Sequence, residues 1–210
     1  MDSSVSVSIQ AGAMVCAGTV FRGDYDIIIG AGTVVQPGVT IDAKNGPVFI
    51  GENNIIEENV TIANSSNEGE PLSIGKMNLF CVGAQVSRCT IGNINIFEPK
   101  CIVGDRCVVG NAASIGPTVE LYPDQTVEDE TVLVRSERPV HKTRFQALPS
   151  AASRTKEKED VYDLETILEQ KPPMMKERNI SRVQRYLEAL RDEGGRSCMK
   201  KQHKLKPPTA

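Results

Sequence analysis

Histidine is scarce in this sequence, and its placement excludes the commonest catalytic arrangements. The 210 residues contain two histidines, His141 and His203, and the first 135 residues contain none. Imidazole is the usual ligand of a catalytic zinc ion and the most frequent general base. The carboxylates Glu52, Glu57 and Glu58 remain, but we interpret them as solvated surface groups. We therefore expect no catalytic residue, no bound metal and no cofactor.

Long hydrophobic runs and aromatic residues are also few. No run of about 18 apolar residues occurs, so neither a transmembrane helix nor membrane insertion is expected. The N-terminal residues 1–4 begin neither a basic nor an apolar segment, and no signal peptide is predicted. Tryptophan is absent and aromatic residues make up 4% of the chain, which suits a narrow core of valine and isoleucine. These features predict a cytoplasmic protein.

The cysteines do not have the spacing of a metal or redox site. None forms a Cys-x-x-Cys motif, and no histidine lies near them. The six are Cys16, Cys81, Cys89, Cys101, Cys107 and Cys198. We interpret them as small buried thiols.

Charge is distributed unevenly along the chain. Residues 1–136 hold 7 Lys and Arg against 16 Asp and Glu, whereas residues 137–210 hold 17 against 11. The change falls near Arg135 and marks a boundary between two parts. The basic part either contacts the acidic part or binds an acidic partner. We expect no nucleic-acid binding, and we interpret the basic segment 195–210 as a disordered tail.

A large apolar residue recurs at every sixth position, with short insertions, through most of the chain. We call these twenty positions the inward positions. They are Ile9, Val15, Phe21, Ile29, Val35, Ile41, Ile50, Ile56, Ile62, Ile74, Phe80, Val86, Ile91, Phe97, Val103, Val109, Ile115, Leu121, Val127 and Leu133. A period of six does not fit an α-helix, which repeats every 3.6 residues. It fits a coil of three short strands, each with one residue pointing into a shared core.

Small residues accompany the inward positions and complete the pattern. Glycine often follows directly, as in Gly51 and Gly75, where it supplies backbone freedom at a turn. The residue four positions later is usually small, because the interior is too narrow for a second large side chain. Coils of this kind must stack to bury their core. The sequence therefore predicts an all-β solenoid, a parallel β-helix of hexapeptide repeats, over residues 5–136.

Three asparagines occupy the small position in successive coils of the predicted solenoid: Asn54, Asn78 and Asn95. Strands in a sheet lie about 4.8 Å apart, so these side chains are expected to stack as a ladder on one face. Buried amides must be hydrogen-bonded, and stacked neighbours can satisfy one another.

The remaining residues form a tail of different character. Residues 137–158 are interpreted as a linker and residues 159–194 as amphipathic helices. Val161, Leu164, Ile167 and Leu168 predict a first helix, ended by Pro172 and Pro173. Ile180, Val183, Leu187 and Leu190 form the apolar stripe of a second, from about Met174 to Glu193. An isolated amphipathic helix is marginal in water, so this stripe is expected to dock on a flat face of the solenoid.

The six-residue pattern resembles that of hexapeptide-repeat proteins, which wind into left-handed β-helices. Some are acyltransferases with a histidine base, and others resemble carbonic anhydrase and bind a metal through three histidines. Residues 21–24, Phe-Arg-Gly-Asp, followed by Ile29 and Gly30, resemble the Arg-Gly-Asp element of the second group. The histidines that such a site needs are missing. A homotrimeric enzyme of either type is the alternative interpretation, and a free-standing scaffold is a third.

A longer set of residues resembles the dynactin subunit 6 family. The set comprises Arg22-Gly23-Asp24, Ile29-Gly30, Thr33-Val34-Val35, Pro37, Gly46-Pro47-Val48, Ile50-Gly51-Glu52, Asn54, Ile56-Glu57-Glu58, Ile74-Gly75, Val103-Gly104 and Glu137-Arg138-Pro139. The likeness covers roughly residues 8–140. It implies a noncatalytic structural subunit of the dynactin pointed-end complex, which supports dynein-driven transport along microtubules and cargo-adaptor binding.

The resemblance also implies partners and a location. The expected partner is a solenoid similar to dynactin subunit 5, in a heterodimer, together with other pointed-end subunits and indirectly dynein and cargo adaptors. The expected location is cytoplasmic and cytoskeleton-associated. A solenoid exposes unpaired strand edges at its ends, which also favours a docked neighbour. Arg22 and Asp24 are candidates for this contact or for an intrachain ion pair.

Overall fold

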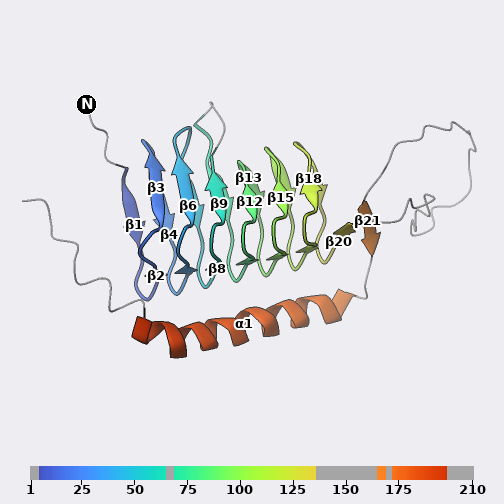
Figure 1. Cartoon of the computed structure of the whole chain (residues 1–210). Coiled ribbons are helices and arrows are strands. Elements are labelled where there is room, and N and C mark those ends of the chain that lie inside the picture. The colour runs from blue at the N-terminus through green and yellow to red at the C-terminus, as the bar shows by residue number, and fades with distance from the viewer. Residues whose placement is uncertain (1–4, 65–68, 136–164, 169–171, 198–210) are drawn as a thin grey trace, which may run out of the picture.

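The computed structural model describes residues 5–64, 69–135, 165–168 and 172–197. Strands β1 to β20 wind into a left-handed parallel β-helix with three strands in each coil, and helix α1 runs along one side of it (Figure 1). The predicted all-β solenoid is confirmed. Each coil stacks on the one before, so the core is a narrow prism shared by all coils.

Three sheets form the sides of the prism. The first sheet contains β1 (Val7–Ile9), β4 (Ile27–Ile29), β7 (Val48–Ile50), β10 (Leu72–Ile74), β13 (Cys89–Ile91), β16 (Cys107–Val109) and β19 (Thr126–Val127). The second contains β2 (Met14–Val15), β5 (Val34–Val35), β8 (Ile55–Ile56), β11 (Leu79–Phe80), β14 (Ile96–Phe97), β17 (Ser114–Ile115), β20 (Val132–Arg135) and β21 (Glu165–Leu168). The third contains β3 (Val20–Gly23), β6 (Thr40–Ala43), β9 (Thr61–Ala63), β12 (Gln85–Val86), β15 (Ile102–Val103) and β18 (Glu120–Leu121).

The strand register confirms the six-residue repeat. In the first sheet Ile9 pairs with Ile29, and Ile29 with Ile50. The inward positions of the other two sheets are in register with one another in the same way. Phe80 and Phe97 stack in adjacent coils with ring centroids 4.6 Å apart, so even the largest core residues follow the repeat.

Glycines after the inward positions serve close packing between coils rather than backbone freedom. A Cβ atom on Gly51 would lie 2.5 Å from the carbonyl oxygen of Gly75, and neither residue has a positive φ. The left-handed conformation falls instead three residues after an inward position. Early coils place glycine there, whereas later coils place Ile94 with φ 66° and Thr118 with φ 59°. The expected reason for the glycines was therefore wrong, although their positions were correct.

Differences in coil length are confined to one corner of the prism. Within a coil the inward positions are always six residues apart, as from Ile74 to Phe80 and from Phe80 to Val86. The chain distance between stacked positions is 20 residues from Ile9 to Ile29 and 24 from Ile50 to Ile74. The extra residues all lie between a strand of the third sheet and the next strand of the first.

The predicted asparagine ladder is confirmed and is fully buried. Asn78 donates from its backbone N–H and from Nδ2 to Oδ1 of Asn54, over 2.8 and 3.1 Å, and its own Oδ1 accepts from the N–H of Asn95. The Nδ2 atoms of Asn54, Asn78 and Asn95 also donate to glycine carbonyls in the next coil. The amides therefore hydrogen-bond successive coils to each other inside the core.

The tail departs from the sequence-based expectation at two places. Residues 165–168 form strand β21, which pairs antiparallel with β20, instead of part of a helix. The unpaired edge of β20 offers hydrogen-bonding groups that a helix could not use, and Thr166 and Ile167 are β-branched and suit a strand. Val161 and Leu164, the rest of that predicted helix, lie outside the described residues, as do the linker 137–158 and the tail beyond Ser197.

The second predicted helix is present but longer than expected. Helix α1 spans Pro172–Ser197, whereas the pattern indicated about Met174 to Glu193. Pro172 and Pro173 begin the helix, because the first turn needs no donor from their backbone nitrogens. Gly194 and Gly195 continue it rather than stop it.

Candidate interaction surfaces

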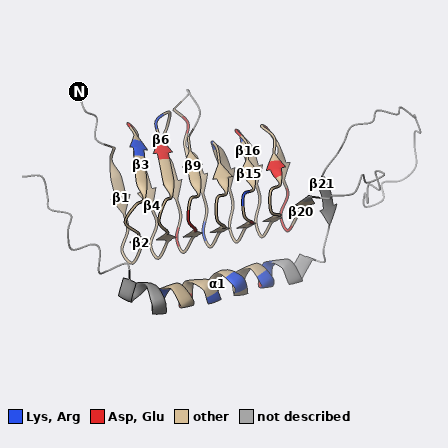
Figure 2. Cartoon of the chain, viewed as in Figure 1, with Lys and Arg blue, Asp and Glu red and all other residues tan. Residues whose placement is uncertain are grey.

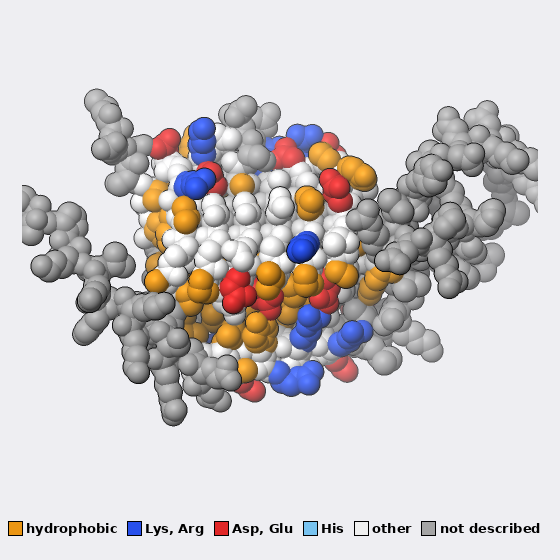
Figure 3. Space-filling view, viewed as in Figure 1, with side chains coloured by type: hydrophobic (Ala, Val, Ile, Leu, Met, Phe, Trp, Pro, Cys, Tyr) orange, Lys and Arg blue, Asp and Glu red, His pale blue; other side chains and the backbone are white. Residues whose placement is uncertain are grey.

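Helix α1 covers the outer face of the second sheet. Val183 is fully buried and Leu187 nearly so, and both pack into a second hydrophobic cluster outside the main core. The solenoid supplies Val34, Ile55, Leu79, Cys81 and Ile96 to this cluster. Leu190 packs against it and Ile180 is half-buried. Figure 3 shows the hydrophobic side chains as a band along the line where the helix meets the coils.

A polar residue inside this contact was not anticipated from the sequence. Asn179 is buried, and its Nδ2 lies within hydrogen-bond distance of the backbone oxygens of Ile94, Ala112 and Ala113 at 3.1 to 3.3 Å. These carbonyls belong to corners of successive coils. Asn179 therefore fixes the position of the helix along the solenoid, which aliphatic contacts alone do not do.

Charged groups border the same contact. Arg182 forms an ion pair with Glu98, with Nη1 2.5 Å from Oε1 and Nη2 3.3 Å from Oε2. Hydrogen bonding to Glu98 raises the pKa of Arg182 above its usual value. Arg178 and Arg185 are exposed on the same helix, and Figure 2 marks the basic residues along it. The predicted proximity of basic tail and acidic solenoid is thus realised at Arg182.

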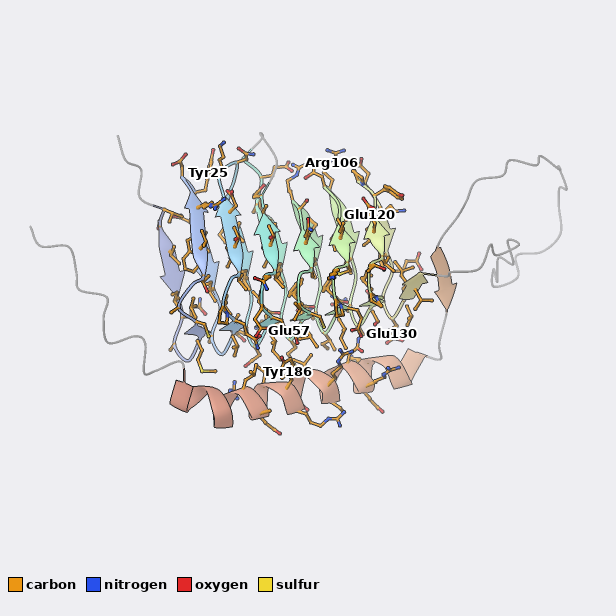
Figure 4. All side chains as sticks on the ribbon, viewed as in Figure 1. Tyr25, Glu57, Arg106, Glu120, Glu130 and Tyr186 are labelled. Carbon is orange, nitrogen blue, oxygen red and sulfur yellow. The ribbon has the colours of Figure 1, made fainter. Side chains whose placement is uncertain are left out.

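An open groove of about 400 Å³ lies beside this ion pair. Its walls are Glu57 and Leu79 from the solenoid and Arg182, Arg185 and Tyr186 from the helix. Figure 4 shows Glu57 and Tyr186 facing each other across the contact. Partial burial raises the pKa of Tyr186, and its hydrogen bond with Glu57 adds to the shift. The groove is lined by residues of both charge signs, Glu57 on the solenoid and Arg182 and Arg185 on the helix.

The sequence contained a signal for this docking face. The residue before each inward position points outward, and in the second sheet it is apolar in five successive coils: Met14, Val34, Ile55, Leu79 and Ile96. The equivalent positions of the third sheet include Thr40, Thr61 and Gln85. An apolar outer ladder on one side of a solenoid predicts a covering element on that side.

Arg22 and Asp24, the candidate contact pair, lie near one end of the solenoid. Arg22 is exposed on β3, where it pairs in register with Asp42. Asp24 is exposed in the turn that follows. Strand β3 is the outermost strand of the third sheet, so both residues border the first coil.

Four of the described thiols are poor nucleophiles and poor metal ligands, because burial raises their pKa values: Cys81, Cys89, Cys101 and Cys107. Burial is the main reason that the pKa values of Cys81 and Cys101 rise to about 12, with nearby Glu98 adding to both. Burial also raises the pKa of Cys89 and of Cys107. Cys16 is half-buried, and Cys198 lies outside the described residues. No group of three or more His, Cys, Asp or Glu side chains with metal-binding geometry occurs in the part of the chain that the structure describes.

Acidic residues at the corner between the third and first sheets are paired with arginines. The buried Arg88 donates from Nη1 to Glu70 over 2.9 Å, and its Nε lies 3.7 Å from Asp105. Asp105 also pairs with Arg106, which binds Asp124 through two nitrogens at 2.6 and 2.7 Å. Hydrogen bonding to Arg106 lowers the pKa of Asp124. These ion pairs join side chains of successive coils.

Comparison with known proteins identifies relatives that match about two thirds of the chain. The chain is 38% identical to dynactin subunit 6 of Nematostella vectensis over 151 residues, covering 64% of this chain and 81% of the relative. It is 37% identical to dynactin subunit 6 of Caenorhabditis elegans, covering 68% and 81%. The protein of Danio rerio is also 37% identical, covering 63% and 72%. No family model matches the chain.

Solved structures show the same fold in distant proteins. A putative acetyltransferase of Bacillus cereus superposes with a TM-score of 0.66 at 13% identity, covering 87% of this chain and 88% of that one. A hexapeptide transferase family protein of Anaplasma phagocytophilum gives 0.65 at 15% identity, covering 92% and 99%. At these identities the likeness concerns the fold alone. Within the described residues, no helix has the long apolar window that a membrane span requires. The identity to these sequence relatives, over 81% of the length of two of them, shows that the chain belongs to the dynactin subunit 6 family.

Proposed function

We propose that this chain is a noncatalytic structural subunit of the pointed-end complex of dynactin. In that role it supports dynein-driven transport along microtubules and cargo-adaptor binding, in the cytoplasm and in association with the cytoskeleton. The observation that carries the proposal is the 36–38% identity to five dynactin subunit 6 proteins over 127 to 155 residues.

The chemistry of the solenoid supports a structural role. Its corners carry hydrogen-bonded amides and arginine–carboxylate pairs that join one coil to the next. Its described buried thiols are held protonated, and the histidines lie beyond the last coil. A general base or a zinc ligand must instead be accessible and able to offer a lone pair.

The proposed direct partner is a second solenoid similar to dynactin subunit 5. Flat sheets, open strand edges and a helix-covered side give a solenoid several surfaces on which a neighbouring subunit can dock. Other pointed-end subunits complete the assembly, and contact with dynein and cargo adaptors is indirect. No nucleic acid, membrane or cofactor takes part in this proposal.

Co-purification tests the proposal directly. The tagged full chain, expressed in its own cells, is expected to recover the actin-related filament and the other dynactin subunits in constant proportion. The matched control is the same tag on the Bacillus cereus-type solenoid, which shares the fold without the family. Recovery of the chain alone would contradict the proposal.

The alternative is an enzyme, because two structures of the same fold have transferase names. Elemental analysis of the purified chain is expected to show no stoichiometric zinc, cobalt or iron, and the chain is expected not to hydrate carbon dioxide. One tightly bound metal per chain, or measurable hydration, would favour the enzyme interpretation.

A further inference from the structure

The two ends of the solenoid differ in how well their core residues are covered. Ile9, the first inward position of its sheet, is 49% exposed, whereas Ile29 directly above it is fully buried. Val15 and Phe21 in the same coil are only half-buried. At the other end Val127 and Leu133 are each 5% exposed. The open apolar surface is therefore at the first coil.

Backbone groups are open at the same end. Strands β1, β2 and β3 are the outermost strands of their sheets among the described residues. In the second coil the carbonyl of Ile29 accepts from Gln10 and that of Val35 from Cys16. The equivalent groups of Ile9 and Val15 face away from the solenoid, where no described strand precedes them. At the opposite end β20 is paired with β21, whereas β18 and β19 are the outermost strands of their sheets among the described residues.

The first coil has few of the devices that normally protect an exposed strand edge, and Arg22 on β3 is the one charged residue in its three strands. Edge strands of monomeric proteins usually carry charged residues, proline or a bulge that prevents further pairing. Residues 5–21 contain no charged residue and no proline. This run forms one complete coil, with three open strands set on the three sides of a triangle. An isolated strand or helix could cover one side of it, but not all three.

We infer that the first coil is the docking surface for the end coil of a partner β-solenoid, which stacks on it and continues its three sheets. This inference rests on the proposed function, which supplies the partner: a different solenoid subunit of the same complex. A coil of the same triangular section pairs with all three edges at once and covers Ile9, Val15 and Phe21. The contact is end-on, and the flat sides of the solenoid remain available to other subunits.

Two lysine substitutions on the same sheet distinguish an end-on from a side-on contact. Ile9→Lys places a charge at the open end, and Val108→Lys places one on the outer side of β16. The two native residues are similarly exposed, at 49% and 46%. The full chain is co-expressed with the subunit 5-like solenoid of the same organism, and the complex is measured by sizing chromatography with light scattering and by titration. Ile9→Lys is expected to raise the Kd at least about tenfold, because a buried charge would be left unpaired, and Val108→Lys less than about twofold.

Hydrogen exchange on the wild-type chain gives a readout that needs no variant. The amides of Val7, Ile9, Val15 and Phe21 are expected to exchange at least about tenfold more slowly in the complex than in the free chain. Thermal melts of Ile9→Lys and Val108→Lys check that both variants are folded.

The outcomes separate the inference from the function on which it rests. If the wild-type chains do not associate, the proposed partnership fails and the inference fails with it. If they associate and Val108→Lys is the weakening variant, the partnership stands and the end-on contact is wrong. If the chain alone forms a dimer that Ile9→Lys dissociates, the occupant is a second copy and the partner solenoid is wrong.

Discussion

At the scale of single residues, each buried asparagine of the ladder must both donate and accept hydrogen bonds inside the core, which few side chains can do. Asn78 donates to Asn54 and to the carbonyl of Gly92 while it accepts from Asn95. Asn78→Ala leaves the carbonyl of Gly92 and the N–H of Asn95 unpaired inside the core, whereas Oδ1 of Asn54 still accepts from the backbone N–H of residue 78. Because each unpaired buried group costs about 1 kcal/mol or more, we expect the variant to lower the free energy of unfolding by about 2 kcal/mol, measured by urea denaturation.

Asn93→Ala is the matched control for this prediction. Asn93 stacks on Asn111 in the same manner, with Nδ2 3.0 Å from its Oδ1, but it is exposed at a corner. Water replaces a lost partner there, so the expected change is below about 1 kcal/mol. Equal losses in the two variants would mean that burial of the amide is not what matters.

The buried thiols make stability depend on pH above neutrality. The pKa values of Cys81 and Cys101 are raised to about 12, whereas a thiol in an unfolded chain ionises near pH 8.5. Between about pH 8.5 and 12 the unfolded chain binds fewer protons than the folded one. The free energy of unfolding therefore falls as the pH rises, by about 1.4 kcal/mol per pH unit for each such thiol.

Removing one thiol tests this account. We expect Cys101→Ala to make the alkaline decline shallower by about 1.4 kcal/mol per pH unit and to leave the slope between about pH 6 and 8 unchanged. The measurement is urea denaturation at several pH values. A loss of packing in the variant lowers the free energy of unfolding equally at every pH, so it does not change the slope against pH that is compared with wild type. Parallel curves for variant and wild type would contradict the assignment.

At the scale of elements, α1 depends on the second sheet for its stability. Val183→Asp with Leu187→Asp would place two carboxylates in the apolar contact with Ile55, Leu79 and Ile96. We expect the helix to be released, with at least about tenfold faster trypsin cleavage, since most of the stability of a helix in a protein comes from the packing of its apolar face. The cleavage rate near Arg185 is followed by mass spectrometry.

Two aspartates on the solvent side of the same helix provide the control. Gln184 and Ala189 are both exposed, so Gln184→Asp with Ala189→Asp adds the same charge without entering the contact. Its cleavage rate is expected to match that of wild type. If the Val183 and Leu187 variant also matched wild type, the helix would not depend on this contact.

The elements also show which features were accessible from sequence. The apolar stripe predicted α1 because a helix repeats locally, within the segment itself. Strand β21 was predicted as helix, because what decides its structure is the free edge of β20, some thirty residues earlier. Asn179 was overlooked for a similar reason. Asn179 matters because its side chain lies within hydrogen-bond distance of three backbone carbonyls of the solenoid. The spacing of residues within the helix does not reveal these contacts.

At the scale of the whole molecule, stability should vary along the solenoid axis. Each coil contacts only its neighbours, so the terminal coil with one neighbour opens most easily. We expect the N–H groups of Gln10 and Cys16, bonded to the second coil, to exchange much faster than that of Gly51, which donates to Ile74 between inner coils. Exchange measured by mass spectrometry or NMR on the free chain checks this, and uniform protection would contradict it.

The whole-molecule architecture was the most predictable feature, and assembly the least. A period of six fixes the register of all twenty inward positions, because one shift would turn every core residue outward. Handedness and the dynactin assignment came from resemblance, since neither follows from spacing. Which surface meets a partner depends on the neighbour's shape as well as this chain's own, so Arg22 and Asp24 could be named only as candidates.

The confinement of unequal coil lengths to one corner also has a practical use. Residues can be added between the third and first sheets without altering the six-residue spacing elsewhere, as the chain itself does between Ile62 and Ile74. A fluorophore tag or an affinity peptide inserted in the turn after Gly23 or Ala43 would leave the register of every inward position unchanged. The same corner gives evolution a place to lengthen the protein, because an insertion within a strand elsewhere would shift the inward positions out of register.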